Sequence, residues 1–262
     1  MFPPLSPKKR IYAIGDIHGY IDALEAMQQA ILDDIEQSDI DPKSDEWDVK
    51  IIYLGDYIDR GAHAFDVIEN LIAERKKSDG IKRIFLSGNH DTYLPRFASG
   101  MPASESLTWF KYGGLNTLKS YGVFDGDQAY DELFPSDIER LQQALKQGLP
   151  KAHKAFIQSL PFVYREEKFI FAHAGIDPRK PLEDQTEDDL MYIREPFLSW
   201  EGTVDAFCVH GHTIFEDPDL KTHRLGIDVG VYRHGRLGCV VLEGDKGRYL
   251  YAQTALQLFE DP

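Results

Sequence analysis

The sequence predicts an α/β fold, and three observations support this prediction. Short runs of β-branched and aromatic residues alternate with longer stretches in which apolar residues recur at helical spacing. Strand-like and helix-like segments follow one another repeatedly from the amino terminus, as they do in a largely parallel sheet. The strand-like runs also end in polar clusters that contain glycine, which is typical of turns after buried strands.

The first part of the chain alternates strand and helix. The expected elements are, in order, a strand at 11–14, a helix at about 21–37, a strand at 51–54, a helix at about 64–77 and a strand at 84–86. In the first helix, Leu24, Met27 and Ile31 lie on one apolar face, as a helix packed on a sheet requires. These segments therefore predict a layer of parallel strands covered by helices.

The middle of the chain, about 104–160, has few strand-like runs and several helical ones, including 136–147 and 151–160. We expect it to form a helical insertion within a single domain that spans residues 1–262. Strand-like runs return after Pro161, and Gly244-Asp245-Lys246-Gly247 resembles the turn of a β-hairpin. The carboxyl-terminal part is therefore expected to be rich in strands and partly antiparallel.

Composition limits the classes of function. The 262 residues include 44 acidic and 29 basic side chains, and the net charge of −15 disfavours non-specific binding to nucleic acid. No apolar run reaches the ~18 residues that a membrane span needs, and the first residues lack the order of a signal peptide. We therefore expect a cytoplasmic protein with no membrane or nucleic-acid partner. Cys208 and Cys239 lie in apolar runs and are expected to be buried thiols.

Five strand-like runs end in residues suited to metal binding or proton transfer. They are Asp16, His18, Asp56, Asp59, Arg60, Asn89, His90, His173, His210 and His212. Loops at strand ends converge in α/β folds, so we expect these side chains to lie close together. Carboxylates, a carboxamide and imidazoles suit divalent first-row metals. Two ions about 3.5–4 Å apart favour in-line displacement at phosphorus, so the sequence predicts a dinuclear phosphoesterase site.

Each polar cluster taken alone also has a structural interpretation. Asp16 could accept backbone N–H groups in a turn, Asp59 and Arg60 could form a charge pair, and Asp91 could cap a helix. The ordered conjunction of all the clusters at strand ends favours metal binding instead. The remaining histidines lie in polar or turn contexts, and we expect them to face solvent: His63, His153, His223 and His234.

Five ordered motifs resemble those of a known family. They are Asp16-Ile17-His18-Gly19, Gly55-Asp56-Tyr57-Ile58-Asp59-Arg60-Gly61, Gly88-Asn89-His90-Asp91, His173-Ala174-Gly175 and Gly211-His212-Thr213. Over about residues 10–252 the chain resembles the phosphoprotein phosphatase family of metallophosphoesterases. It is most similar there to bacterial serine/threonine phosphatases of the phage-lambda type, including the segments Trp109–Gly114 and Tyr192–Phe197. The resemblance implies a four-layer α/β/β/α sandwich with two mixed sheets.

The resemblance also implies the ligands of two divalent metal ions. Asp16, His18 and Asp56 would hold the first ion, and Asp56, Asn89, His173 and His212 would hold the second. Manganese is the ion that the resemblance implies, and iron and zinc suit the same ligands. By the family pattern the histidine directly after Gly211 is the ligand, so His210 would at most support the site.

The same resemblance implies how the reaction proceeds. Arg60 and Arg194 would bind phosphate oxygens, because a planar guanidinium suits a tetrahedral anion. His90, oriented by Asp59, would deliver a proton to the leaving group. A hydroxide that bridges the two metals would attack phosphorus in line, with no phosphoenzyme.

The expected activity is hydrolysis of phosphomonoesters, above all phosphoserine or phosphothreonine in proteins. One alternative is hydrolysis of diadenosine tetraphosphate, because Asp91 stands where dinucleoside-polyphosphate hydrolases carry aspartate and animal phosphatases carry glutamate. Asp59 and Arg60 follow the phosphatase pattern, whereas an aromatic side chain beside the cleft would favour the dinucleotide. A second alternative is a noncatalytic metal-binding scaffold, which is disfavoured because every ligand position is filled.

Overall fold

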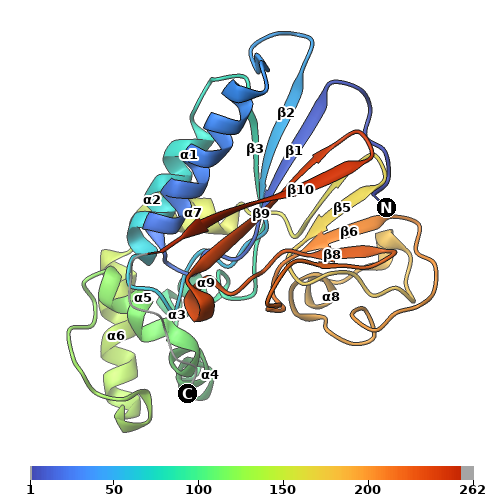
Figure 1. Ribbon diagram of the computed structural model, residues 1–262. Helices are drawn as coiled ribbons and strands as arrows, with labels where there is room; N and C mark the ends of the chain where they lie inside the picture. The colour runs from blue at the N-terminus through green and yellow to red at the C-terminus, as the bar shows by residue number, and fades with distance from the viewer. Residues whose placement is uncertain (1, 255–262) are drawn as a thin grey trace.

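Two five-stranded sheets face each other in the computed structural model, which describes residues 2–254 (Figure 1). The strands are β1 (Lys9–Ile14), β2 (Asp48–Tyr53), β3 (Lys82–Phe85), β4 (Val163–Glu166), β5 (Phe169–Ala172), β6 (Phe207–His210), β7 (Asp219–Leu220), β8 (Arg224–Gly226), β9 (Arg236–Glu243) and β10 (Lys246–Gln253). The expected domain limits, residues 1 and 262, lie outside the described part of the chain. The extent of the domain therefore stays a prediction.

Both sheets are mixed, as the resemblance implied. The first has the order β10-β9-β1-β2-β3, in which β1, β2 and β3 are parallel and the β9–β10 hairpin is antiparallel. The second has the order β4-β5-β6-β8-β7, in which β5, β6 and β8 are parallel. Because parallel strands end on the same side of a sheet, the loops after these six strands gather where a ligand site is expected.

The side-chain alternation of β1 explains the layers. Ile11 and Ala13 belong to the apolar core between the two sheets, whereas Tyr12 and Ile14 belong to the core beneath α1 (Ile21–Gln37) and α2 (Ala64–Arg75). On the far face of the second sheet, α8 (Glu187–Tyr192) packs over β5 and β6. The four-layer α/β/β/α sandwich is therefore confirmed.

The expected helical insertion is also present. Its elements are α4 (Ala103–Trp109), the π-helical turn η1 (Phe110–Gly114), α5 (Leu115–Ser120), the 3-10 turn η2 (Tyr130–Glu132), α6 (Pro135–Gly148) and α7 (Lys151–Gln158). In α6, Ile138, Leu141 and Leu145 are buried at helical spacing. Helix α6 packs onto α3 (Tyr93–Ala98) and α4, and α5 and α7 pack onto α2, beside the short helix α9 (Val231–His234) (Figure 1).

Two histidines that we expected to face solvent are buried. His153 lies between α7 and α2, where its Nε2 is 2.6 Å from Glu69 Oε1 and its Nδ1 is 2.8 Å from the hydroxyl of Tyr121. His223 is buried against Phe197, whose carbonyl oxygen lies 3.2 Å from its Nε2. Both expectations were wrong because tertiary packing supplies partners that are remote in sequence.

Other expectations from the sequence agree with the structure. Cys208 and Cys239 are buried free thiols. The first helix spans Ile21–Gln37 as expected, and the second ends at Arg75, two residues early. Within the described residues, no helix combines the length and the apolar character needed to cross a membrane. The cytoplasmic location stays a prediction.

A cluster of charges joins the two sheets at the end remote from the parallel strand ends. Lys9 of β1 forms ion pairs with Glu166 and, at 2.9 Å, with Glu167. Lys50 of β2 lies 3.2 Å from the other carboxylate oxygen of Glu166. Burial opposes ionisation of Glu166, but the hydrogen bonds from Lys9 and Tyr164 hold its pKa below the ordinary value.

Candidate metal centre

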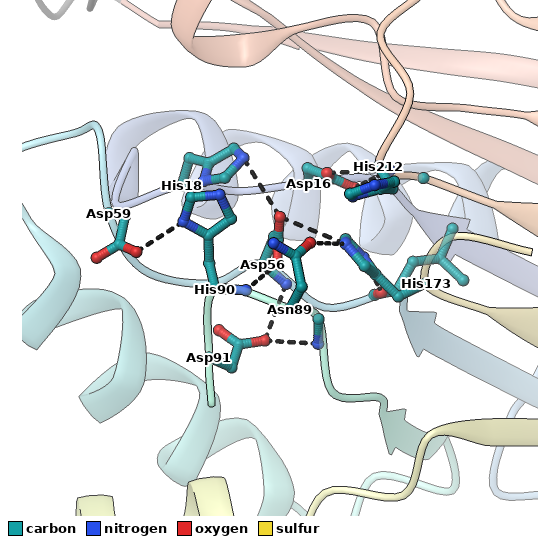
Figure 2. A network of polar contacts seen from close by, with 12 residues as sticks. Asp16, His18, Asp56, Asp59, Asn89, His90, Asp91, His173 and His212 are labelled. Atoms are coloured by element: carbon teal, nitrogen blue, oxygen red, sulfur yellow. Dashed lines mark hydrogen bonds and ion pairs between the residues drawn. The ribbon is translucent and has the colours of Figure 1, made fainter. Parts of the chain in front are cut away.

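The expected site residues come together in the loops that follow the parallel strands (Figure 2). Five of them have a left-handed backbone, with φ between 48° and 71°: His18, Asp56, Asp59, Arg60 and His212. This conformation costs an L-residue roughly 1–2 kcal/mol, so the loops hold these side chains in place against local preference. Gly55, at φ 101°, has no such cost, and a Cβ there would lie 2.3 Å from the backbone nitrogen of Gly88.

Asp56 lies at the centre of the cluster. Its Oδ2 is 3.6 Å from His18 Nε2 and 3.4 Å from His173 Nε2, and its Oδ1 accepts the backbone N–H of His90 at 3.0 Å. Asn89 reaches the same centre, because its Oδ1 is 3.0 Å from His173 Nε2. Figure 2 shows these side chains converging from different loops.

The donor atoms form two groups that share Asp56. In the groups His18–Asp56–His90 and Asp56–His173–His212, the candidate ligand atoms lie within 4.8 Å of one another. Two groups that share one carboxylate have the composition of a dinuclear centre, in which a carboxylate bridges the ions.

Backbone carbonyls orient two of the imidazole rings. The Nδ1 atoms of His18 and His173 each lie 3.0 Å from a carbonyl oxygen, of Ile58 and Leu54 respectively. Donation from Nδ1 leaves Nε2 as the coordinating atom, and both Nε2 atoms point toward Asp56. The loops therefore present the ring nitrogens that a metal would need.

Asp16 adjoins the second group through His212. Its carboxylate accepts the backbone N–H of His212 at 3.1–3.2 Å. The residue before His212 has to be glycine, because a Cβ at Gly211 would lie 2.1 Å from Asp16 Oδ1. The sequence Gly211-His212 thus lets the loop after β6 approach the carboxylate that follows β1.

The electrostatics of the site favour bound cations. Burial raises the pKa of Asp16 well above its ordinary value, and the charge of Asp228 adds to the rise. Burial opposes ionisation of Asp56 too, but the charges of His173 and His90 hold its pKa well below the ordinary value. Several buried carboxylates at one place require positive charge nearby.

The imidazoles of His18 and His212 also suit a site that binds cations. Burial lowers the pKa of His18 well below its ordinary value, and burial with the charge of His173 lowers the pKa of His212 to about 2. Both rings are therefore neutral, as metal ligands must be. Burial opposes protonation of His173, but the charges of Asp56 and Asp16 raise its pKa to about 10, so a bound metal would have to displace that proton. The buried His212 Nε2 has no hydrogen-bond partner. This orphaned nitrogen and the carboxylates around it fit divalent metal ions.

Asp228 is a site residue that the sequence analysis missed. It lines the cleft, is buried, and has a pKa raised to about 6 by burial and by the charge of Asp56. Its Oδ1 accepts the backbone N–H of Gly230 at 2.9 Å. Asp228 lies two residues after the end of β8, as Asp16 lies two residues after the end of β1, so an aspartate just past a strand end was the available signal.

Asp59 and His90 form a hydrogen-bonded pair that the insertion holds. The Nδ1 of His90 lies 2.7 Å from Asp59 Oδ2, and the indole N–H of Trp109 donates to that same oxygen at 2.8 Å. The hydroxyl of Thr117 donates to Asp59 Oδ1 at 2.6 Å. Burial opposes protonation of His90, but the charges of Asp56 and Asp59 raise its pKa.

Asp91 holds two site loops together rather than capping a helix. Its Oδ2 accepts the backbone N–H groups of Asp56 at 2.9 Å and Gly88 at 2.8 Å, and its Oδ1 accepts that of Tyr57 at 2.8 Å. The helix that follows begins at Tyr93 without a side-chain cap. Asp91 therefore fixes the position of Asp56 relative to the loop that carries Asn89 and His90.

A cleft of about 450 Å³ opens above this centre. Its lining includes four cationic side chains: Arg60, Arg194, Lys111 and Arg233. The guanidinium carbon of Arg60 lies 4.0 Å from the ring centroid of Tyr232 and 5.9 Å from that of Tyr112. Gly113 lets η1 pack against Arg60, since a Cβ there would lie 2.3 Å from its backbone nitrogen.

His210 lies outside the two ligand groups. Its Nε2 is 3.3 Å from a guanidinium nitrogen of Arg224, and its Nδ1 is 3.0 Å from the carbonyl oxygen of Gly211. Burial and the charge of Arg224 lower its pKa to about 3. The structure thus places His210 beneath the loop that carries His212, as a neighbour of the site.

Two mixed sheets with this carboxylate–imidazole cluster at their parallel strand ends define a metal-dependent phosphoesterase. Residues 9–225 match the model of the family described as calcineurin-like phosphoesterase, and the chain belongs to that family. The broad part of the resemblance is thereby confirmed. The narrower likeness to phosphatases of the phage-lambda type stays a prediction.

Several relatives are named as tetraphosphatases. The chain is 27% identical over 243 residues to the asymmetrical bis(5'-nucleosyl)-tetraphosphatase PrpE of Bacillus thuringiensis, covering 86% of this chain and 87% of the relative. It is 26% identical over 202 residues to the PrpE of Anoxybacillus flavithermus, covering 72% and 73% of the two chains.

Solved structures share the fold. A protein provisionally assigned as a diadenosine tetraphosphatase aligns with a TM-score of 0.60 and 20% identity, over 94% of this chain and 96% of the other. A cold-active protein-tyrosine phosphatase from a psychrophilic Shewanella aligns with a TM-score of 0.52 and 15% identity, over 95% and 83% of the two chains.

Proposed function

We propose that the chain hydrolyses dinucleoside tetraphosphates with the aid of two divalent metal ions. The observation that carries this proposal is the cationic lining of the cleft in a chain of net charge −15: Arg60, Arg194, Lys111 and Arg233. Four cations around one centre exceed the needs of a single phosphate group and suit a chain of phosphates. The names of the bacterial relatives support the same substrate class.

An aromatic side chain beside the cleft also supports a nucleotide substrate. Tyr112 lines the cleft and is 42% exposed, so its ring is available to stack on a base. The sequence analysis named such a residue as the feature that would favour the dinucleotide over the phosphoprotein.

The family resemblance supplies the proposed ligands of each ion. Asp16, His18 and Asp56 would hold the first ion, and Asp56, Asn89, His173 and His212 the second. The donor groups support His18, Asp56, His173 and His212, and Asn89 and Asp16 lie beside them, whereas we propose that His90, which also adjoins the first group, moves a proton. When bound, the ions supply a water that deprotonates near neutral pH and positive charge for the phosphorus oxygens. Carboxylate, carboxamide and imidazole donors suit manganese, the ion that we propose, and also iron and zinc.

The remaining side chains orient the substrate and move a proton. Arg60 and Arg194 would bind the oxygens of the reacting phosphate from the walls of the cleft. His90 would donate a proton to the leaving oxygen, and the carboxylate of Asp59 at its Nδ1 would keep the ring oriented and charged.

Hydrolysis of phosphoserine or phosphothreonine is the second candidate. The hydrogen-bonded pair of His90 and Asp59 favours it, because an alkoxide leaving group needs a proton more than a nucleotide phosphate does. A phosphorylated protein would then be the partner that the cleft receives.

One competition experiment separates these candidates. Manganese-reconstituted protein is offered diadenosine tetraphosphate or a phosphothreonine peptide over the same concentration range, with chromatographic detection of the nucleotide or peptide products and a chelator-treated blank. We expect a higher kcat/KM for the dinucleotide. Preference for the peptide would replace the proposal with the second candidate. Equal and negligible rates for the parent and Asp56→Asn would indicate the noncatalytic scaffold.

A further inference from the structure

A side cleft of about 280 Å³ lies next to the catalytic cleft, on the surface of the insertion. Its walls come from η1, α5 and the segment 124–130, none of which supplies an expected metal ligand. The side chain of Lys111 lines both clefts. The two clefts therefore adjoin at Lys111, and an extended ligand that occupied both would pass this side chain.

The lining of the side cleft suits a nucleoside. Tyr130, which is half-buried, supplies aromatic surface, whereas Phe124 is buried and only 7% exposed. The ammonium of Lys119 lies 5.5 Å from the ring centroid of Phe124 and 3.6 Å from Asp127 Oδ1. The exposed carboxamide of Gln128 offers a donor and an acceptor, and the carboxylate of Asp127 offers acceptors for hydroxyl groups. Aromatic faces beside polar groups of both kinds are the features with which proteins bind bases and riboses.

The side cleft is fixed relative to the phosphate-binding arginine. Asn116, which lines the side cleft, donates through its Nδ2 to the carbonyl oxygen of Arg60. Gly113, also in its lining, packs directly against the backbone of Arg60. A ligand that spans both clefts therefore meets two sites whose separation is set before binding, which reduces the entropic cost of association.

We propose that the side cleft binds the nucleoside at the far end of a dinucleoside tetraphosphate, with Lys111 binding the phosphates that connect it to the reacting one. This inference rests on the proposed function and adds the residues that distinguish substrates. A phosphomonoester fills the catalytic cleft alone, whereas a dinucleotide also gains the contacts of the insertion. Lys119 and Gln128 are thus specificity residues remote from the reacting atoms.

The test uses two matched double variants. Lys119→Met with Gln128→Ala alters the side cleft, and Lys146→Met with Gln147→Ala makes the same changes at exposed positions on α6 of the same insertion. For each protein, kcat/KM for diadenosine tetraphosphate is divided by kcat/KM for phenyl phosphate. We expect this ratio to fall about tenfold in the side-cleft variant and to stay within about twofold in the control. Equal ratios in all three proteins would overturn the inference.

A binding measurement keeps the two proposals separable. Saturation-transfer NMR with ADP on the metal-free proteins, each carrying Tyr112→Ala so that no base stacks on that ring in the catalytic cleft, should show strong adenine signals for the parent and the α6 control. The signals should be weaker by at least about threefold for the side-cleft variant. Equal adenine signals in the three proteins would overturn the side cleft as a nucleoside site. Failure of the parent to cleave the dinucleotide would contradict the proposed function instead, while the ADP signals still decide the side cleft.

Discussion

The indole N–H of Trp109 donates a 2.8 Å hydrogen bond to Asp59 Oδ2, the oxygen that also lies 2.7 Å from His90 Nδ1. Trp109 ends α4 and is fully buried, so the insertion reaches the proposed proton donor through a rigid side chain. Thr117 at the other carboxylate oxygen makes the same link from α5. The insertion therefore holds the proposed catalytic groups in position as well as forming the side cleft.

Trp109→Phe should reduce catalysis in proportion to how much the leaving group needs a proton. The change removes one donor to Asp59, so the carboxylate orients His90 less firmly. We expect about a tenfold loss of kcat with an alkyl phosphate and less than about threefold with an aryl phosphate, whose phenolate leaves without assistance. Steady-state kinetics with both ester classes measures this difference.

Phe97→Leu is the control for lost packing, because the Phe97 ring contacts Trp109 at 5.0 Å between centroids but forms no hydrogen bond to Asp59. An equal loss with both esters in Trp109→Phe would contradict the positioning role.

Asp91→Asn should loosen the centre without touching a ligand. The carboxamide presents one oxygen where the carboxylate presents two, and its NH2 group would face a backbone N–H of Asp56, Tyr57 or Gly88. We expect the free energy of unfolding to fall by about 1–3 kcal/mol, with weaker metal binding. Urea titration and manganese titration measure the two effects. Exposed Asp125→Asn is the control, and parent-like values for Asp91→Asn would rule out its role in joining the loops.

His212→Ala should remove one equivalent of bound metal. His212 supplies one of the nitrogen atoms of the second group, and its buried Nε2 has no other partner. Metal content after manganese loading and gel filtration is read by mass spectrometry, with two equivalents expected for the parent and one for the variant. His234→Ala, at an exposed position, should retain two. Two equivalents in His212→Ala would refute the ligand assignment.

Glu166→Gln should destabilise the protein near neutral pH and progressively less in acid. Folding lowers the pKa of Glu166, so its contribution is present above the ordinary value of 4.5 and is lost as the pH falls through and below that value. Loss of this carboxylate leaves Lys9 and Lys50 with fewer partners, and we expect a cost of about 2 kcal/mol at pH 7.

Denaturant unfolding of parent and variant at pH 7, 5 and 4 tests the sign of this effect. The stability difference should shrink toward pH 4, and exposed Glu139→Gln should show no difference at any pH. A difference that grows in acid would contradict the linkage.

Local pattern was sufficient for most of the fold because buried strands and amphipathic helices leave different apolar patterns. A continuous apolar run at 11–14 predicted β1, which begins two residues earlier, and helical spacing of Leu24, Met27 and Ile31 predicted α1. The end of α2 was misplaced because Lys76 and Lys77 favour helix, so nothing local stops it at Arg75.

In the candidate site, too, some residues were predicted from the sequence and others were not. Residues next to glycine at strand ends, such as Asp16 and His212, were found because the fold brings those ends together. Asp228 was missed because no histidine or second acid accompanied it. The roles of Trp109 and Thr117 depend on the packing of the insertion, since they meet Asp59 across 50 and 58 residues of chain.

Among the described residues, eight that are not glycine have a positive φ, and five of these carry proposed catalytic or binding groups: His18, Asp56, Asp59, Arg60 and His212. Replacing Arg60 by glycine would relieve backbone strain of roughly 1–2 kcal/mol while deleting a proposed phosphate-binding side chain. At buried Asp59 the lost hydrogen bonds with Trp109, Thr117 and His90 would outweigh that relief. Selection for thermal resistance alone would therefore favour losing the proposed activity at Arg60. An engineered thermostable variant should keep these five residues unchanged and gain its resistance elsewhere, for example on the solvent face of α6.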